Sequence, residues 1–143
     1  MSQPELTVLL VDDSLVVRRV LGKLLDRHPR IGRVFAASDA AEGYSLFKVS
    51  RPDAVVLDLE LPDLHGVEVL KQMKSADPSC IVIVLTSVAE TGVRDECLRL
   101  GANRFVNKEQ GLRTVPDTIA TLCPHPPRNG HNHKPKTRTQ GSP

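Results

Sequence analysis

Five polar residues of this chain directly follow strand-like apolar runs. They are Asp12 and Asp13 after 6–11, Asp58 after 54–57, Thr86 after 80–85, and Lys108 after 104–107. Near-continuous apolar runs of this length are typical of strands that are buried on both faces of a parallel sheet. Because the carboxyl ends of parallel strands lie along one edge of the sheet, we expect these five side chains to converge on one crevice.

Three carboxylates, a hydroxyl and an amine in one crevice favour the binding of a divalent cation and a phosphoryl group. Two like charges about 4 Å apart repel by about 4 kcal/mol at an effective dielectric constant of 20, so the acidic cluster needs a cation or a proton. Mg²⁺ prefers such oxygen ligands. A carboxylate such as Asp58 can also act as a nucleophile and form an aspartyl-phosphate. Lys108 would balance charge on the phosphoryl group, and Thr86 would donate a hydrogen bond to it.

A purely structural interpretation exists for each of these residues taken alone. An acidic pair after a strand is often only a helix cap, which would account for Asp12 and Asp13. Asp58 is harder to explain in this way, because an acid that follows branched apolar residues must be paired or functional. The joint placement of all five residues at strand ends favours the functional interpretation.

Strand-like and helix-like segments alternate along the chain. The strand-like runs span 6–11, 33–37, 54–59, 80–85 and 103–107. The helix-like segments span 14–27, 39–49, 64–75, 90–100 and 111–123. Five β-then-α units with short links predict an α/β fold with a five-stranded parallel sheet, doubly wound as a (βα)5 sandwich.

Composition divides the chain into an expected domain, 1–123, and a basic tail rich in Pro and His, 124–143, which reads as disordered. The net charge is +2, but residues 1–123 carry 15 basic and 17 acidic side chains, so the domain has no nucleic-acid footprint. No apolar run approaches the ~20 residues of a transmembrane helix, and no signal peptide is evident. The three widely spaced cysteines indicate buried thiols in a reducing cytoplasm.

These motifs resemble the receiver domain of two-component response regulators, of the stand-alone CheY-like type. The resemblance runs from Leu6 to Leu122. Its motifs are Asp12-Asp13, the segment 58–66 with sequence DLELPDLHG, Thr86-Ser87, and Phe105-Val106-Asn107-Lys108. The resemblance implies a flavodoxin-like sandwich with strand order 2-1-3-4-5.

The resemblance also implies a role for each acidic residue. Asp58 would be the phosphoacceptor, taking its phosphoryl group from a histidine kinase, a histidine phosphotransfer protein or a small acyl phosphate. Asp13, Asp58 and the backbone carbonyl of Glu60 would bind Mg²⁺ directly, and Asp12 would hold it mainly through water. The side chain of Glu60 could also lean over the phosphoryl group and slow its hydrolysis.

Three further residues receive roles from the resemblance. Thr86 and Lys108 would contact the phosphoryl oxygens. Phe105 would be the switch aromatic, turning inward when Thr86 moves toward the phosphate. The chain departs from the family in two places: the residue after the lysine is usually proline and here it is Glu109, and the second departure is Glu60.

We therefore expect a cytoplasmic, phosphorylation-dependent switch without an attached output domain. It would not be an enzyme beyond promoting its own phosphorylation and dephosphorylation. The face built from 90–100 and 105–122 would bind a downstream protein or form a homodimer. Two alternatives are a phosphate shuttle or sink in a phosphorelay, and a Mg²⁺-dependent phosphatase that uses an aspartyl-phosphate.

Overall fold

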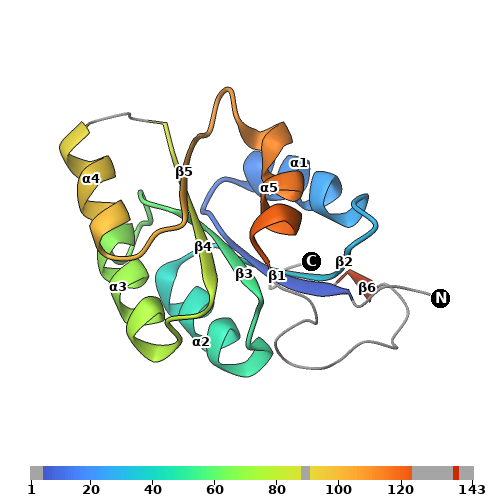
Figure 1. Ribbon diagram of the computed structural model, residues 1–143, viewed down its shortest axis with the longest axis horizontal. Helices are drawn as coiled ribbons and strands as arrows, with labels where there is room; N and C mark the ends of the chain where they lie inside the picture. Colours follow the sequence, from blue (N-terminus) through green and yellow to red (C-terminus); the bar gives the residue numbers. More distant parts are fainter. Residues whose placement is uncertain (1–4, 88–90, 124–136, 139–143) are drawn as a thin grey trace.

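The apolar runs form the strands of a single parallel sheet (Figure 1). The computed structural model describes residues 5–87, 91–123 and 137–138. The five main strands are β1 Leu6–Val11, β2 Ile31–Ala37, β3 Ala54–Asp58, β4 Ile81–Thr86 and β5 Arg104–Asn107. They lie in the order β5-β4-β3-β1-β2, and every neighbouring pair is parallel. The predicted flavodoxin-like order 2-1-3-4-5 is confirmed.

Strand register places the carboxyl ends of the strands at one edge of the sheet. Val11 at the end of β1 pairs with Leu57, one residue before the end of β3. Asp58 pairs with Leu85 of β4, and the next residue of β4, Thr86, pairs with Asn107 of β5. This alignment brings together residues that are far apart in the sequence.

Helices cover both faces of the sheet (Figure 1). On one face lie α1 Leu15–Asp26 and α5 Val115–Leu122, which pack against each other. On the other face lie α2 Ala40–Ser50, α3 Gly66–Ala76 and α4 Thr91–Arg99. The predicted doubly wound sandwich with five helices is therefore confirmed.

Each face of the sheet has its own apolar core. Leu21 of α1 and Ile119 of α5 belong to the core on one face, while Phe47 of α2 and Leu70 of α3 belong to the core on the other. Most core strand residues have no exposed surface. Full burial of one such side chain stabilises the fold by about 1.5–3 kcal/mol, so the two cores fix the sheet edge firmly.

Side-chain caps start helices α1 and α2. The hydroxyl of Ser14 accepts a hydrogen bond from the N–H of Val17 at 3.2 Å and so starts α1 directly after the acidic pair. Asp39 accepts from the N–H of Glu42 at 2.8 Å, and the Glu42 carboxylate accepts from the N–H of Ser38 at 2.9 Å. The Ser14 and Asp39 caps each satisfy an N–H group of the first turn that has no partner within the helix.

Helix α5 is shorter than the predicted segment 111–123. A 3₁₀ turn occupies Leu112–Thr114, and the α-helix runs only from Val115 to Leu122. Pro116 lies in its first turn. Proline has no N–H to donate within a helix and is tolerated only in the first turn, so the regular helix starts there and not at residue 111.

The sheet gains a sixth, two-residue strand from the tail. This strand, β6 (Thr137–Arg138), pairs in parallel with Arg33 and Val34 of β2. The composition of 124–143 predicts disorder and no strand. An edge strand presents unpaired N–H and C=O groups, and β6 pairs with some of those of β2. The remaining tail residues lie outside the described part of the chain, so the boundary of the domain 1–123 stays a prediction.

The buried thiols predicted from composition are observed. Cys80, Cys97 and Cys123 are all buried, and none of the three forms a disulfide. Burial raises the pKa of the Cys97 thiol, with Glu96 acting in the same direction, so this thiol is less nucleophilic than an exposed one. Among the helices of the described residues, none has the length and apolar character needed to span a bilayer.

The close approach of Gly66 to the end of β3 leads to a first prediction. A Cβ at this position would lie 2.4 Å from Leu59 Cα and 2.7 Å from the Asp58 carbonyl oxygen, both backbone atoms. We expect Gly66→Ala to lower the free energy of unfolding by about 1–3 kcal/mol through overpacking. The measurement is chemical denaturation followed by circular dichroism.

Gly92 provides the matched control for this substitution. It lies in α4, and a Cβ there would meet nothing within 4 Å. Gly92→Ala should raise the free energy of unfolding by about 0.5–1 kcal/mol, because alanine favours the helix. Equal effects of the two substitutions would contradict the proposed close contact at Gly66.

Candidate functional site

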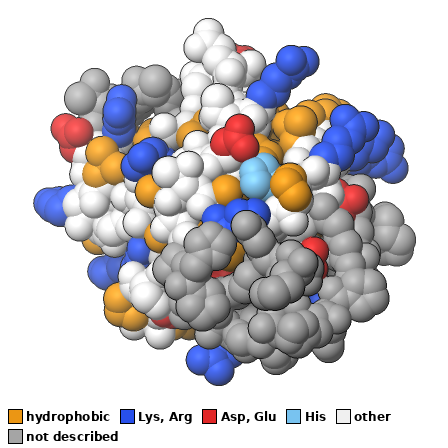
Figure 2. Space-filling view, turned by 45° about the vertical axis from the view of Figure 1, so that its right-hand side comes forward, with side chains coloured by type: hydrophobic (Ala, Val, Ile, Leu, Met, Phe, Trp, Pro, Cys, Tyr) orange, Lys and Arg blue, Asp and Glu red, His pale blue; other side chains and the backbone are white. Residues whose placement is uncertain are grey.

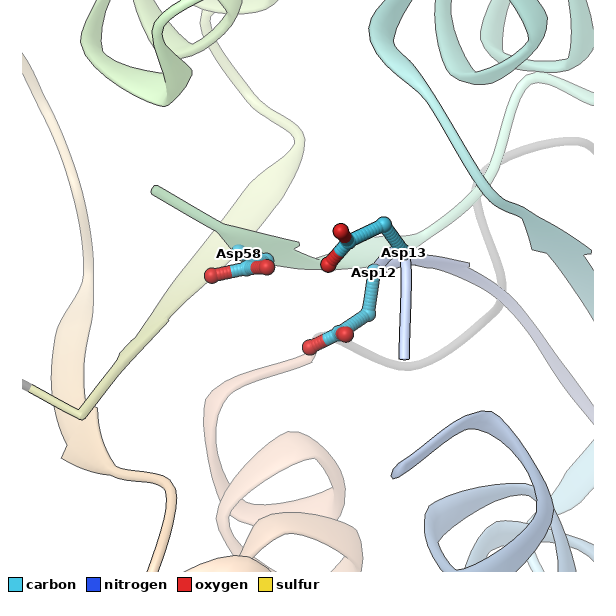
Figure 3. Close-up of side chains that lie close together, drawn as sticks. All are labelled: Asp12, Asp13 and Asp58. Atoms are coloured by element: carbon cyan, nitrogen blue, oxygen red, sulfur yellow. The ribbon is translucent and has the colours of Figure 1, made fainter. Parts of the chain in front are cut away.

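Three carboxylates meet at the edge of the sheet (Figure 3). Asp12 and Asp13 directly follow β1, and Asp58 is the last residue of β3. An oxygen from each lies within 4.8 Å of one from each of the other two. Asp12 and Asp58 have no exposed surface, whereas Asp13 is exposed. The predicted convergence of these side chains is therefore observed, with one open side toward solvent.

Lys108 supplies the positive charge that this cluster requires. Its Nζ lies 3.0 Å from Oδ2 of Asp12 and 3.2 Å from Oδ2 of Asp58. Neither oxygen has another hydrogen-bond partner among the described residues, so the ammonium group is their counter-charge. The Lys108 side chain is only 14% exposed. Two buried carboxylates thus share one largely buried cation, as the placement of Lys108 after β5 predicts.

The remaining oxygens of the two buried carboxylates accept backbone hydrogen bonds. Oδ1 of Asp12 accepts from the N–H of Ser14 at 2.8 Å. Oδ1 of Asp58 accepts from the N–H of Glu60 at 3.0 Å. Each carboxylate therefore turns one oxygen to the following loop and the other to Lys108, which fixes the orientation of both groups.

Burial and charge shift the pKa values at the site in a consistent way. Burial raises the pKa of Asp12, and the negative charge of Asp58 acts in the same direction, against the Ser14 N–H and Lys108. Burial alone would lower the pKa of Lys108, but its contacts with Asp12 and Asp58 outweigh burial and raise it. Lys108 is therefore held in its charged form.

Thr86 lies on β4, the strand next to Asp58, and Phe105 lies on β5, one strand further out. Thr86 ends β4 and is only 4% exposed, and its carbonyl oxygen accepts from the N–H of Lys108 at 2.9 Å. Phe105 pairs with Val84 and packs, partly buried, against the core under α2, α3 and α4. The structure therefore brings Thr86 to the same edge as the acidic cluster and places Phe105 two residues behind it on the neighbouring strand.

Comparison with known proteins identifies the family. A family model described as the response regulator receiver domain matches residues 8–120. The chain belongs to the receiver domain family of response regulators. This assignment agrees with the acidic cluster, Thr86 and Lys108 at the edge of the sheet.

Curated relatives of this receiver domain are longer proteins. The chain is 34% identical over 148 residues to a protein-glutamate methylesterase/protein-glutamine glutaminase of Treponema denticola, covering 96% of this chain and 38% of that protein. The identity is 36% over 118 residues with the protein of the same description from Treponema pallidum, covering 78% of this chain and 29% of that protein. The chain thus spans roughly a third of the length of these relatives.

Solved receiver structures have the same fold. The response regulator domain of Thermotoga maritima CheB is 30% identical, with a TM-score of 0.75 over 82% of this chain and 96% of that one. A two-component response regulator of the LuxR family from Aurantimonas is 25% identical, with a TM-score of 0.72 over 88% of this chain and 91% of that one. Both comparisons cover nearly all of the solved domain.

A hydrogen bond at the mouth of the receiver site was not anticipated from the sequence. The hydroxyl of Ser87 donates to Oε1 of Glu60 at 3.0 Å. Both side chains are exposed, Glu60 two residues after Asp58 and Ser87 one residue after Thr86. The bond links the loops that follow β3 and β4. Sequence patterning indicated the two loops but not that these two side chains would meet.

Asp63 is a second residue that the sequence analysis missed. Its two carboxylate oxygens accept from the N–H groups of Ala40 at 2.8 Å and Ala41 at 3.0 Å, at the start of α2. These hydrogen bonds, that of Ala40 foremost, lower the pKa of Asp63. The loop after Asp58 is thereby tied to α2. The sequence does not predict this contact, because Asp63 is a polar loop residue and its partner Ala40 is 23 residues away in the sequence.

The donor atoms at the site fit a hard divalent cation. The acidic cluster offers carboxylate oxygens only, and the exposed position of Asp13 leaves room for water ligands. Mg²⁺ takes one or two carboxylates and keeps several waters, so this donor set suits it. Because the Lys108 ammonium already neutralises Oδ2 of Asp12 and Asp58, a cation would approach from the side of Asp13.

The shared ion pair leads to a second prediction. Lys108→Met should lower the free energy of unfolding at neutral pH by about 3 kcal/mol in the absence of divalent cations, because two buried carboxylates lose their counter-charge. Saturating Mg²⁺ should restore a large part of this loss, since a ligand of the native state stabilises by about 2.7 kcal/mol at 100 times its Kd. Denaturation with and without Mg²⁺ provides the measurement.

Lys23→Met serves as the control, because Lys23 is an exposed residue of α1. Its substitution should change the free energy of unfolding by less than about 0.5 kcal/mol, with or without Mg²⁺. If Lys108→Met and Lys23→Met behaved alike, Lys108 would not be the counter-charge of the acidic cluster.

Proposed function

We propose that this receiver domain is a Mg²⁺-dependent phosphorylation switch whose phosphoacceptor is Asp58. The observation that carries this proposal is the Lys108 ammonium group, 3.0 Å and 3.2 Å from two fully buried carboxylates beside the exposed Asp13. Such an arrangement holds one carboxylate ready as a nucleophile and provides fixed positive charge where a phosphoryl group would gain negative charge.

The reaction is a transfer of the phosphoryl group to Asp58. A carboxylate oxygen of Asp58 forms a bond to phosphorus, while the bond from phosphorus to the donor's imidazole nitrogen or acyl oxygen breaks, and the donor leaves with that electron pair. Bound Mg²⁺ would neutralise charge on the carboxylates and on the phosphoryl oxygens. Asp13, Asp58 and the Glu60 carbonyl would hold it directly, with Asp12 acting mainly through water.

Thr86, Lys108 and Phe105 would turn phosphorylation into a change of surface. The Thr86 hydroxyl and the Lys108 ammonium would contact phosphoryl oxygens, which the position of both at the sheet edge supports. Movement of Thr86 toward the phosphate would leave space for Phe105, now only partly buried, to turn inward. The domain would thus have two packings, with Phe105 turned outward or inward. The phosphoryl group would interact more strongly with the inward packing and so favour it.

The partner that delivers the phosphoryl group would be a histidine kinase or a histidine phosphotransfer protein. An apolar patch on α1, next to the site, supports this: Leu15, Val16 and Val20 are exposed. Exposed basic residues of α1 and its end, Arg19 and Lys23 among them, lie beside it. The face that Figure 2 presents carries basic and apolar side chains next to one another. A partner with apolar and acidic side chains would fit.

The face formed by α4, β5 and α5 would carry the output. Leu98 is exposed on α4, and Phe105 lies on β5 between the two helices in sequence. A downstream protein, or a second copy in a homodimer, would bind there in the cytoplasm. The methylesterase activity in the names of the relatives is theirs, and for this chain we propose only that it promotes its own phosphorylation by an external donor and its own dephosphorylation.

A third prediction tests the phosphoacceptor directly. Incubation with acetyl phosphate and Mg²⁺ should add a single phosphoryl group, measured by intact-mass spectrometry. Asp58→Ala should abolish the addition, because it removes the nucleophile. Omission of Mg²⁺ should also abolish it.

Asp26→Asn is the matched control, because Asp26 is a carboxylate at the end of α1 that takes no part in the cluster. It should be phosphorylated as the wild type is. Phosphorylation of Asp58→Ala at the wild-type level would refute the proposal. Continuous release of phosphate from a generic phosphomonoester would instead favour a phosphatase.

A fourth prediction concerns the lifetime of the phosphorylated state. The Ser87–Glu60 hydrogen bond draws the Glu60 carboxylate toward the loop after β4, where it would hinder the water that hydrolyses the aspartyl-phosphate. Glu60→Asn should shorten the lifetime about fivefold, the effect of roughly 1 kcal/mol on the barrier. The loss of phosphoryl label over time provides the measurement.

Two companion variants separate the effect of the size of the Glu60 side chain from the effect of its position. Glu60→Gln keeps the length of the side chain and its bond to Ser87, so it should stay close to the wild-type lifetime. Ser87→Ala releases the Glu60 side chain and should shorten the lifetime by a smaller factor than Glu60→Asn. An unchanged lifetime in Glu60→Asn would show that Glu60 does not hinder hydrolysis.

A further inference from the structure

Directly after Lys108 the chain makes a tight turn that is organised by one side chain. The N–H groups of Glu109 and Gln110 both donate to Oδ1 of Asn107, at 2.8 Å and 3.2 Å. The N–H of Gly111 donates to the backbone oxygen of Asn107 at 2.8 Å. Asparagine side chains stabilise turns in this way by accepting from the backbone two or three residues ahead.

Close packing at Gly111 shows how tightly this turn folds back on β5. A Cβ at Gly111 would lie 2.5 Å from Cγ1 of Val106 and 3.0 Å from the carbonyl oxygen of Asn107. Only glycine, which has no Cβ, fits at position 111 without displacing these two atoms. The turn therefore has little freedom to move relative to the end of the strand.

The same turn fixes the backbone on both sides of Lys108. Before it, Asn107 pairs with Thr86 in the sheet, and the N–H of Lys108 itself donates to the Thr86 carbonyl oxygen at 2.9 Å. After it, the next two N–H groups are held by the Asn107 side chain. A long lysine side chain has many rotamers, so a fixed starting point narrows the region that its ammonium group can reach.

The hydrogen bond from Glu109 requires a residue with a backbone N–H at this position. Proline, which has no N–H, could not donate to the Asn107 side chain. Here Glu109 supplies that N–H. The turn after the lysine is therefore stabilised in this chain by a side-chain hydrogen bond and not by a proline ring.

We propose that Asn107 is a positioning residue that holds Lys108 in place to bridge Asp12 and Asp58 and, in the phosphorylated state, to contact the phosphoryl group. The second half of this statement rests on the proposed function. Asn107 itself does not touch the acidic cluster through any contact seen among the described residues, and it acts through the backbone of the turn.

The test compares Asn107→Ala with Asn107→Asp and Asn107→Ser, which keep an acceptor oxygen. Asn107→Ala should bind beryllofluoride, a mimic of the phosphoryl group, about three- to tenfold more weakly in the presence of Mg²⁺, the effect of losing one or two hydrogen bonds. The Kd for Mg²⁺ alone should be unchanged or lower, because Lys108 competes with the metal for the carboxylates. Asn107→Asp and Asn107→Ser should restore beryllofluoride binding.

Gln110→Ala is the control for the turn, because it removes an exposed side chain and leaves the N–H in place. It should behave as the wild type. If Asn107→Ala bound beryllofluoride as the wild type does, Asn107 would not position Lys108. If it weakened beryllofluoride and Mg²⁺ binding together, lowered the melting temperature and was not rescued by Asn107→Asp, Asn107 would be a purely structural residue.

A crystal structure of Asn107→Ala separates this inference from the proposed function. We expect Nζ of Lys108 to move away from Oδ2 of Asp12 or Asp58, compared with 3.0 Å and 3.2 Å here. Unchanged distances would overturn the inference, whether or not the protein is phosphorylated. Failure of the wild type to bind beryllofluoride, with displaced Lys108 in the variant, would overturn the proposed function and leave the positioning role supported.

Discussion

The requirement that two fully buried carboxylates share one positive charge organises the edge of the sheet. Asp12 directly follows β1 and Asp58 ends the neighbouring strand β3, and within the described chain only the ammonium group of Lys108 faces the inner oxygen of each. Burying such charges without a partner costs several kcal/mol per ion. Strand order and register must therefore bring β5 close enough for Lys108 to reach across β4 to both carboxylates.

The loops around this cluster are held by side chains whose partners lie on other elements. Asp63 ties the loop after β3 to the start of α2, Ser87 and Glu60 join the loops after β3 and β4, and Asn107 closes the turn after β5. The two apolar cores fix the strands, and these side-chain hydrogen bonds fix the loops at the carboxyl ends of the strands. A site assembled in this way can respond to a change of charge at Asp58 without unfolding the sheet.

Much of this arrangement follows from the sequence, because buried parallel strands read as continuous apolar runs. The five main strands, their order by family resemblance, and the meeting of Asp12, Asp13, Asp58 and Lys108 were all predicted. Boundaries were less accurate: β2 begins at Ile31, two residues before the expected start. The Asp63 and Ser87 contacts could not be predicted, because polar loop residues carry no periodicity and their partners are set by tertiary packing.

The central claim is that a metal ion and the phosphoryl group share the edge of the sheet with Lys108. A crystal structure with Mg²⁺ and beryllofluoride tests it most directly. We expect beryllium bonded to a carboxylate oxygen of Asp58, Mg²⁺ about 2.1 Å from an oxygen of Asp13, and the Lys108 ammonium in contact with a fluoride. Mg²⁺ bound elsewhere, or beryllofluoride absent from Asp58 at saturating concentrations, would contradict the claim.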